Sequence, residues 1–286
     1  MTIVPCAPDV AAVRSCVLPY EKLAVGFVSH LLRADTSVFV AQTDDGMVCD
    51  AFSFSDGGQI LHCLPDAYGK RHDELFCALT AFFRTQKKHE LFNIIGEEQG
   101  TELVRTALQT ALGRTTQHEQ SYLLLEHKPA ANYDDHTIHV PLFGEPLTTV
   151  HCTPMMIDAL LALQIAYEKE EVAWAHDQVD EKVSRLSFLH ALRTQHIFAI
   201  AKNGAYIAKG GTNALGRQYA QLGGIYTVPT ERGKGYATQL VRHITSTLQE
   251  QGKKCVLFVK PENVPAVRLY KTCGFTQIGR FAIAYF

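Results

Sequence analysis

The stretch Gly223-Gly224-Ile225-Tyr226-Thr227-Val228-Pro229-Thr230-Glu231-Arg232-Gly233-Lys234-Gly235-Tyr236-Ala237-Thr238 decides the fold of the second half of the chain. Its first part is rich in β-branched and aromatic residues and predicts a strand that Pro229 ends. Its last part opens an apolar helical pattern that runs on to Leu248. A strand, a glycine turn and a helix start in succession direct backbone N–H groups and the positive end of a helix dipole at one point. Such a point favours an anion, most often a phosphate.

Three kinds of loop are candidates for this pattern. A dinucleotide-binding fold requires Gly-x-Gly-x-x-Gly or Ala, but Thr238 stands three residues after Gly235. A P-loop requires Ser or Thr after its Gly-Lys pair, whereas Gly235 follows Lys234. An ordinary glycine-rich turn from strand to helix, without any ligand, stays open on the loop alone.

A second motif follows about thirty residues downstream. Cys255–Val259 predicts a buried strand, and Asn263-Val264-Pro265-Ala266-Val267-Arg268-Leu269-Tyr270-Lys271-Thr272-Cys273-Gly274-Phe275 predicts a short helix closed by Gly274. The pairing of Arg-x-x-Gly-x-Ala with Asn-x-x-Ala-x-x-Leu-Tyr-x-x-x-Gly-Phe resembles the GNAT superfamily of acyl-CoA-dependent N-acetyltransferases. The resemblance covers roughly residues 148–286 and is specific, because two separate motifs occur in the right order and spacing.

The resemblance implies that acetyl-CoA is the acyl donor and that the glycine loop cradles its pyrophosphate. Main-chain groups of Ile225 to Thr227 would run along the pantetheine arm, and a backbone N–H near Thr227 would stabilise the oxyanion. Asn263 would bond the cofactor arm. The expected acetyl-CoA-binding residues are therefore Ile225, Tyr226, Thr227, Arg232, Gly233, Lys234, Gly235, Tyr236, Ala237, Thr238 and Asn263.

Tyr270 is the expected general acid, because a phenol with a pKa of ~10 stays protonated at neutral pH and can donate to a departing thiolate. The alternative is a tyrosine that only packs on its helix face. The strand before the phosphate loop contains no acid, so the expected bases are Glu168 and Glu171 in the segment between two helices that lines the acceptor side in this family. The ordinary alternative for these acids is a solvated charged surface.

Composition restricts the remaining possibilities. The chain has 286 residues, enough for two domains, and a net charge of −2, which favours neither nucleic acid nor a membrane surface as the main partner. Its eight cysteines are scattered without Cys-x-x-Cys pairs, so we expect no metal site and a reduced, cytoplasmic compartment. No apolar run approaches the ~18 residues of a membrane helix, and no signal-peptide pattern is present.

Periodicity predicts the same order of elements in both halves: helix, three strands, helix, strand, helix, strand. The predicted elements of the first half are a helix at Tyr20–Ala34, strands at Ser37–Gln42, Met47–Ser55 and Gln59–Leu64, a helix at Arg71–Gln86, a strand at Glu90–Ile95, a helix at Glu97–Leu112 and a strand at Ser121–Glu126. In the second half we predict helices from Thr153 to about Glu168 and over Asp180–Thr194, strands at His196–Ala201, Tyr206–Asn213 and Tyr219–Val228, and one or two closing strands in Thr276–Phe286.

We therefore expect an α/β fold with a mixed sheet, built of two GNAT-like domains in tandem. Residues 1–130 form the degenerate domain, 131–148 a linker and 149–286 the catalytic acetyltransferase domain. In the first domain the segment Asp66–Asp73 replaces the glycine loop, and its one glycine and two carboxylates suit a phosphate poorly. An unrelated α+β domain in residues 1–130 is the alternative.

The expected function is N-acetyl transfer from acetyl-CoA to an amine by direct attack in a ternary complex, since no cysteine stands in a motif that would mark it as an acyl carrier. The acceptor is a small molecule or a protein amine, and an oligomer is compatible with the sequence. The alternative from another functional class is a non-catalytic module that binds or senses acyl-CoA.

Overall fold

The computed structural model describes residues 1–7, 10–32, 37–55, 57–86, 90–128, 148–172 and 179–286. Apart from Thr148, the predicted linker 131–148 lies outside these residues. Each half of the described chain has one succession of elements: strand, two helices, three strands, helix, strand, helix, strand. The repeated order predicted from periodicity is therefore present, with one further strand at the start of each half and one further helix at the start of the first half.

The first half contains, in order, β1 (Thr2–Cys6), α1 (Ala11–Val17), α2 (Val25–Leu31), β2 (Val38–Gln42), β3 (Val48–Phe54), β4 (Gln59–Cys63), α3 (His72–Thr85), β5 (Asn93–Glu97), α4 (Glu98–Leu112) and β6 (His118–His127). The second half contains β7 (Thr148–His151), α5 (Ile157–Tyr167), α6 (Glu181–Thr194), β8 (Ile197–Lys202), β9 (Ala205–Leu215), β10 (Tyr219–Thr227), α7 (Tyr236–Glu250), β11 (Lys254–Val259), α8 (Val264–Thr272) and β12 (Phe275–Tyr285).

The differences from the predicted elements lie at the start of each half and at the end of the chain. In the second half, strand β7 was not predicted. Strand β1 was not predicted; it contains Pro5 and pairs only with β2, at the edge of the sheet, where a missing N–H is tolerated. The predicted helix from Tyr20 is wrong in its first turn, because Leu18–Leu23 form a 3-10 turn and Ala24 interrupts the helical backbone before α2. The closing segment is a single strand, β12, with an irregularity between Gln277 and Gly279.

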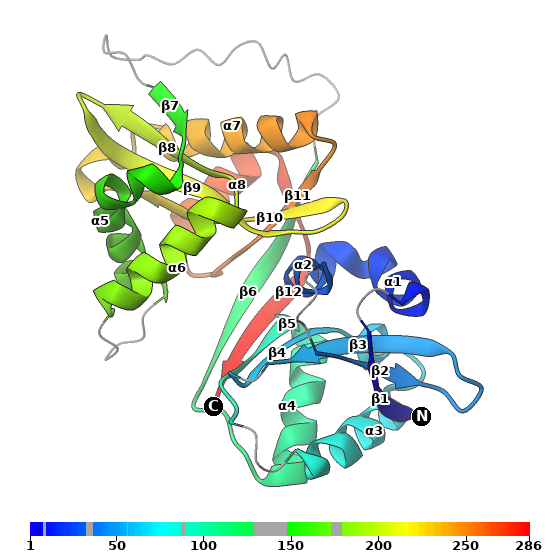
Figure 1. The fold of residues 1–286 in the computed structure, drawn as a ribbon. Coiled ribbons are helices and arrows are strands. Elements are labelled where there is room, and N and C mark those ends of the chain that lie inside the picture. The colour runs from blue at the N-terminus through cyan, green and yellow to red at the C-terminus, as the bar shows by residue number, and fades with distance from the viewer. Residues whose placement is uncertain (8–9, 33–36, 56, 87–89, 129–147, 173–178) are drawn as a thin grey trace.

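One twelve-stranded sheet runs through both halves in the order β1-β2-β3-β4-β5-β12-β6-β11-β10-β9-β8-β7. The last strand of the chain, β12, lies between β5 and β6 of the first half, pairing Ala282 with Gly96. Strand β6 in turn pairs with β11 of the second half, Leu125 opposite Leu257. Figure 1 shows β6 and β12 running together from one lobe to the other. Each half thus receives a strand from the other.

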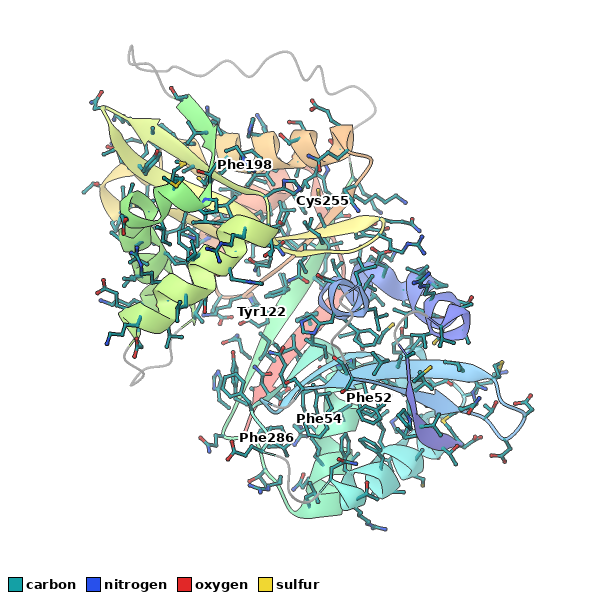
Figure 2. The ribbon with its side chains drawn as sticks, viewed as in Figure 1. Phe52, Phe54, Tyr122, Phe198, Cys255 and Phe286 are labelled. Carbon is teal, nitrogen blue, oxygen red and sulfur yellow. The ribbon has the colours of Figure 1, made fainter. Side chains whose placement is uncertain are left out.

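Each lobe has its own apolar core. In the first lobe Phe52, Phe54 and Phe286 belong to one cluster, so the C-terminus packs into the core of the N-terminal half (Figure 2). In the second lobe Phe198 and Cys255 pack against α7 and α8. Among the described residues, no helix combines the length and the apolar character needed to cross a membrane.

Candidate functional site

The sheet opens at the centre of the second lobe. Strands β10 and β11 pair in parallel from Tyr219 opposite Lys254 to Leu222 opposite Leu257, where the pairing ends. Strand β10 continues to Thr227 and then turns into α7. The two strands therefore splay apart beside residues 223–227. This segment includes Ile225 to Thr227, for which the family resemblance predicted main-chain contacts to the pantetheine arm.

A bulge lies on β10 at this opening. Gly223 stands opposite Gly211 and Tyr226 opposite Lys209, so β10 holds one extra residue, and Gly224 has a φ of +64°. The Lys209 Nζ donates to the Gly224 carbonyl oxygen at 3.0 Å. Because the C=O and N–H of one trans peptide point in opposite directions, the Ile225 N–H points away from Lys209.

Thr227 also directs its backbone away from β9. The Val228 N–H donates to the Ile207 carbonyl of β9 at 2.9 Å. Because successive residues of an antiparallel strand direct their backbone groups to alternate sides, the N–H and C=O of Thr227 point away from β9. The Thr227 carbonyl accepts from Arg232 Nε at 3.0 Å, as this orientation requires. The hydroxyl Oγ1 of Thr227 is buried without a hydrogen-bond partner among the described residues. A buried polar atom of this kind needs a partner from elsewhere.

The glycine loop ends in an uncapped helix. Gly233 and Gly235 have φ values of +77° and +83°, and Gly235 is the N-cap of α7. No side chain caps α7, and its first turn contains no acid. A Cβ added at either glycine would meet nothing within 4 Å, so the space above the loop is open. The first amides of α7, at Tyr236, Ala237 and Thr238, are thus available to an anion.

The charged residues of the loop pair with carboxylates of the protein. Arg232 Nη2 lies 2.7 Å from Glu170 Oε2, and Lys234 Nζ lies 3.0 Å from Glu231 Oε2. Lys202 also reaches Glu231. Exposed pairs such as that of Arg232 contribute only ~0–1 kcal/mol. The side chain of Arg232 links the strand end at Thr227 to the segment after α5.

The predicted acids lie in one π-helical turn, Glu168–Val172, directly after α5, but they face different partners. Glu168 accepts from the Gln164 amide at 2.7 Å and from the Ser184 hydroxyl, and so ties α5 to α6. Glu171 Oε1 accepts from Asn263 Nδ2 at 2.9 Å. Burial raises the pKa of the Glu171 carboxyl, while the Lys260 ammonium opposes this rise.

Glu171 is thereby brought next to the second predicted motif. Asn263 caps α8 by accepting from the Ala266 N–H at 3.1 Å, so one side of its amide orients the helix and the other holds Glu171. Tyr270 on α8 is buried, and its ring lies 5.9 Å from that of Phe275. Burial raises the pKa of the Tyr270 phenol, and the nearby Tyr167 and Glu171 raise it further. The phenol therefore stays protonated.

A cavity of about 230 Å³ lies on the face of the sheet covered by α5 and α6 and reaches the bulge at Gly223 and Gly224. Its other walls include Tyr167, Phe188 and Lys209. Lys209 was not singled out by the sequence reasoning. It is only 2% exposed, its Nζ lies 4.6 Å from the centre of the Tyr167 ring, and burial lowers its pKa to about 7.

Comparison with known proteins now identifies the fold. A sequence model of the acetyltransferase (GNAT) family matches residues 160–275, which hold the glycine loop, the bulge, Glu168, Glu171 and Tyr270. Residues 160–275 therefore have the sequence pattern of a GNAT acetyltransferase domain. No curated protein matches the sequence.

Solved structures extend the GNAT likeness to the whole chain. An acetyltransferase of the GNAT family from Colwellia psychrerythraea is 17% identical, with 100% of both chains covered and a TM-score of 0.53. A tandem GNAT protein from the clavulanic acid biosynthesis pathway is 12% identical, with 99% of this chain and 97% of that one covered and a TM-score of 0.57. At these identities the likeness is one of fold, and it confirms the predicted tandem of GNAT-like halves in a mixed α/β sheet.

Proposed function

We propose that the chain is an N-acetyltransferase that moves an acetyl group from acetyl-CoA to an amine by direct attack in a ternary complex. One observation carries the proposal. The same strand, β10, lines the cavity under α5 and α6 with its bulge and then runs into the uncapped N-terminus of α7. A donor held by its phosphates at α7 would extend along β10 to meet an acceptor held in the cavity.

The residues of the opening fit such a donor. The amides of Tyr236 to Thr238 would hold a pyrophosphate, and the positive φ values of Gly233 and Gly235 keep side chains out of its way. The backbone of Ile225 to Thr227 would run beside the pantetheine arm as a neighbouring strand does. The unpartnered Thr227 hydroxyl supports this placement, because an extended amide chain in the opening would supply the missing partner.

The transfer step follows from the positions of the remaining groups. The neutral amine attacks the thioester carbonyl carbon, forming the C–N bond, and the backbone N–H of Ile225 or Thr227 stabilises the oxyanion. When the intermediate collapses, the C–S bond breaks and the Tyr270 hydroxyl gives its proton to the leaving thiolate. The amine nitrogen loses one proton to a base of the protein, and this proton replaces the one that Tyr270 gave to the thiolate, so the net products are an amide and CoA thiol.

Of the two predicted bases, Glu171 fits the removal of the amine proton better. Its carboxyl is partly buried, carries a raised pKa and interacts electrostatically with Tyr270. It would accept the proton directly or through a water molecule and return it to the Tyr270 phenolate. Glu168 is engaged by Gln164 and Ser184, and we propose that it positions α6 against α5.

The test is the release of CoA thiol from acetyl-CoA with a panel of primary amines. We expect acceptor-dependent release by the native chain and its loss in Gly235→Asp, because a carboxylate at the N-cap of α7 would occupy the place of the pyrophosphate and repel it. Calorimetry should show that Gly235→Asp loses acetyl-CoA affinity, while circular dichroism shows an unchanged fold. Tight acetyl-CoA binding without thiol release from any amine would instead favour the non-catalytic acyl-CoA sensor.

A further inference from the structure

Lys209 is a buried cation placed where the cavity meets the bulge of β10. One of its three N–H donors is used by the Gly224 carbonyl at 3.0 Å, and its Nζ lies 4.6 Å and 5.5 Å from the ring centres of Tyr167 and Phe188. No described carboxylate forms an ion pair with it. A buried ammonium without a paired anion is costly unless something compensates its charge.

Apart from the Gly224 carbonyl and the two aromatic rings, the described walls of the cavity offer this charge no carboxylate. None of the described residues that line it is Asp or Glu, and its only basic side chains are those of Lys209 and His190. Glu168 acts electrostatically on Lys209, but its carboxylate already binds Gln164 and Ser184. A polycationic acceptor in this cavity would therefore be repelled by Lys209 and would find no carboxylate to bind. An anionic group could instead accept hydrogen bonds from the remaining N–H donors of Lys209.

The size of the cavity limits what can carry this anion. Its volume of about 230 Å³ lies below the ~300–1,000 Å³ of pockets that enclose drug-sized ligands. Its remaining walls offer uncharged polar groups, among them the side chains of Gln164, Gln195 and Thr212. A compact, polar metabolite suits this space better than a large glycoside.

We infer that the acceptor is a small amine that also carries a carboxylate, and that Lys209 recognises that carboxylate while the amine points toward the bulge of β10. This inference deepens the proposed transferase function and rests on it. The side chains facing Lys209 are those of Tyr167 on α5, Glu168 after it, Phe188 and His190 on α6 and Cys152 after β7. Lys209 is thus a specificity-determining residue and takes no part in breaking or forming the acyl bond.

The test compares amines that differ only in a carboxylate or its carboxamide: glycine with glycinamide, β-alanine with its amide, and 4-aminobutyrate and 6-aminohexanoate with their amides. Affinity for the full chain saturated with CoA is measured by calorimetry, and kcat/KM by thiol release. In at least one pair we expect the carboxylate member to be favoured by about 10- to 100-fold. Lys209→Met should remove this preference, and Lys254→Met, at an exposed position on β11, should keep it.

A second readout concerns pH. Since the pKa of Lys209 lies near 7, the ratio of kcat/KM for the carboxylate and carboxamide members should fall as the pH rises above 7. The ratio cancels the pH dependence of the transfer step and should be flat in Lys209→Met. Unchanged acetyl-CoA affinity in Lys209→Met shows that the variant is folded.

Three outcomes would overturn the inference. The first is the absence of a carboxylate preference in every pair, even where amines are acetylated; this result leaves the transferase function standing. The second is an equal loss of turnover for both members of a pair in Lys209→Met with unchanged affinities, which would assign Lys209 to proton transfer. The third is a preference for spermidine over all carboxylated amines. Carboxylate-selective binding without thiol release from any amine would support the recognition by Lys209 and contradict the transferase function.

Discussion

At the scale of single residues, two polar side chains of the motifs bind partners within the protein. Arg232 is engaged by Glu170 and the Thr227 carbonyl, and Asn263 by Glu171 and the start of α8. Both residues bind the segment after α5, Arg232 through Glu170 and Asn263 through Glu171. The residue types were readable from sequence because glycine, asparagine and tyrosine stand at fixed spacings. The contacts of Arg232 with Glu170 and of Asn263 with Glu171 were not, since each joins residues far apart in the chain.

The Tyr270 hydroxyl is needed only when the thiolate leaves, so its removal should affect kcat. For Tyr270→Phe we expect a ~10²–10⁴-fold lower kcat and an acetyl-CoA affinity within about threefold of the native value. Steady-state kinetics measure the change in kcat, and calorimetry measures the change in acetyl-CoA affinity. The buried ring contacts with Phe275 persist in phenylalanine, which keeps packing effects small. A kcat within threefold of native, with the chemical step shown to limit turnover, would leave Tyr270 with a packing role.

The raised pKa of Glu171 gives a distinct pH profile. With a carboxylate base, kcat/KM rises as the pH passes the pKa of that base and then stays constant up to the amine pKa of ~10. Because burial raises the pKa of Glu171, the rise should occur at a higher pH than for an ordinary glutamate. In Glu171→Gln only the free amine reacts, so kcat/KM should keep rising about tenfold per pH unit toward pH 10. At pH 7 the variant should be slower by ~10²–10⁴-fold.

The Glu171 profile is best measured with a carboxamide acceptor, so that the titration of Lys209 does not enter. Glu181→Gln, at an exposed position in the first turn of α6, is the matched control and should keep the native profile. Coincident profiles for native protein and Glu171→Gln would exclude Glu171 as the base.

At the scale of elements, the strand–turn–helix of β10 and α7 was predictable from end to end, because glycine, proline and apolar periodicity mark it locally. The cavity on the other side of β10 was not. A register shift in β9, where Ile200 pairs with Ala208 but Ala201 with Tyr206, breaks the two-residue alternation of side chains just before Lys209. A strict alternation therefore does not tell which face Lys209 occupies. The apolar run Ala205–Ala208 directly before Lys209 was the signal in the sequence that its charge is buried.

At the scale of the whole molecule, the sequence predicted two halves with one order of elements but not how they join. The pairing of β12 with β5 and β6 is a contact between residues distant in the chain, and no local pattern encodes it. Buried polar contacts also cross between the halves: Glu21, only 1% exposed, accepts from the backbone N–H groups of Gln218 and Tyr219 at 2.9 and 3.0 Å. The two lobes are thus built to hold a fixed relative position, and the division into domains at residues 130 and 149 remains a proposal.

The equivalent opening in the first lobe is filled. Strands β4 and β5 pair in parallel up to Leu61 opposite Ile95. The next residue of β4 is His62, which therefore takes the position that Gly223 has on β10 of the second lobe. The His62 ring presses against the β5–α4 corner, since a Cβ on Gly96 would come within 2.2 Å of its Nε2, and it bonds the Thr101 hydroxyl at 2.9 Å. Burial lowers the pKa of His62 to about 3, so the ring stays neutral. Only about 10 Å³ is left beside it, room for roughly one water molecule.

We therefore predict that each chain binds one acetyl-CoA, although it contains two lobes of the same build. The first lobe also lacks the glycine loop: Asp66 there pairs with Arg71 at 2.9 Å, which leaves a carboxylate where the second lobe has an open cradle. Calorimetric titration of the full chain should give a stoichiometry near one, lost in Gly235→Asp. In His62→Ala the stoichiometry should stay near one, because removing the ring does not create amides free to hold a pyrophosphate. Two equivalents bound by the native chain, or one equivalent retained by Gly235→Asp, would show that the first lobe is itself a donor site.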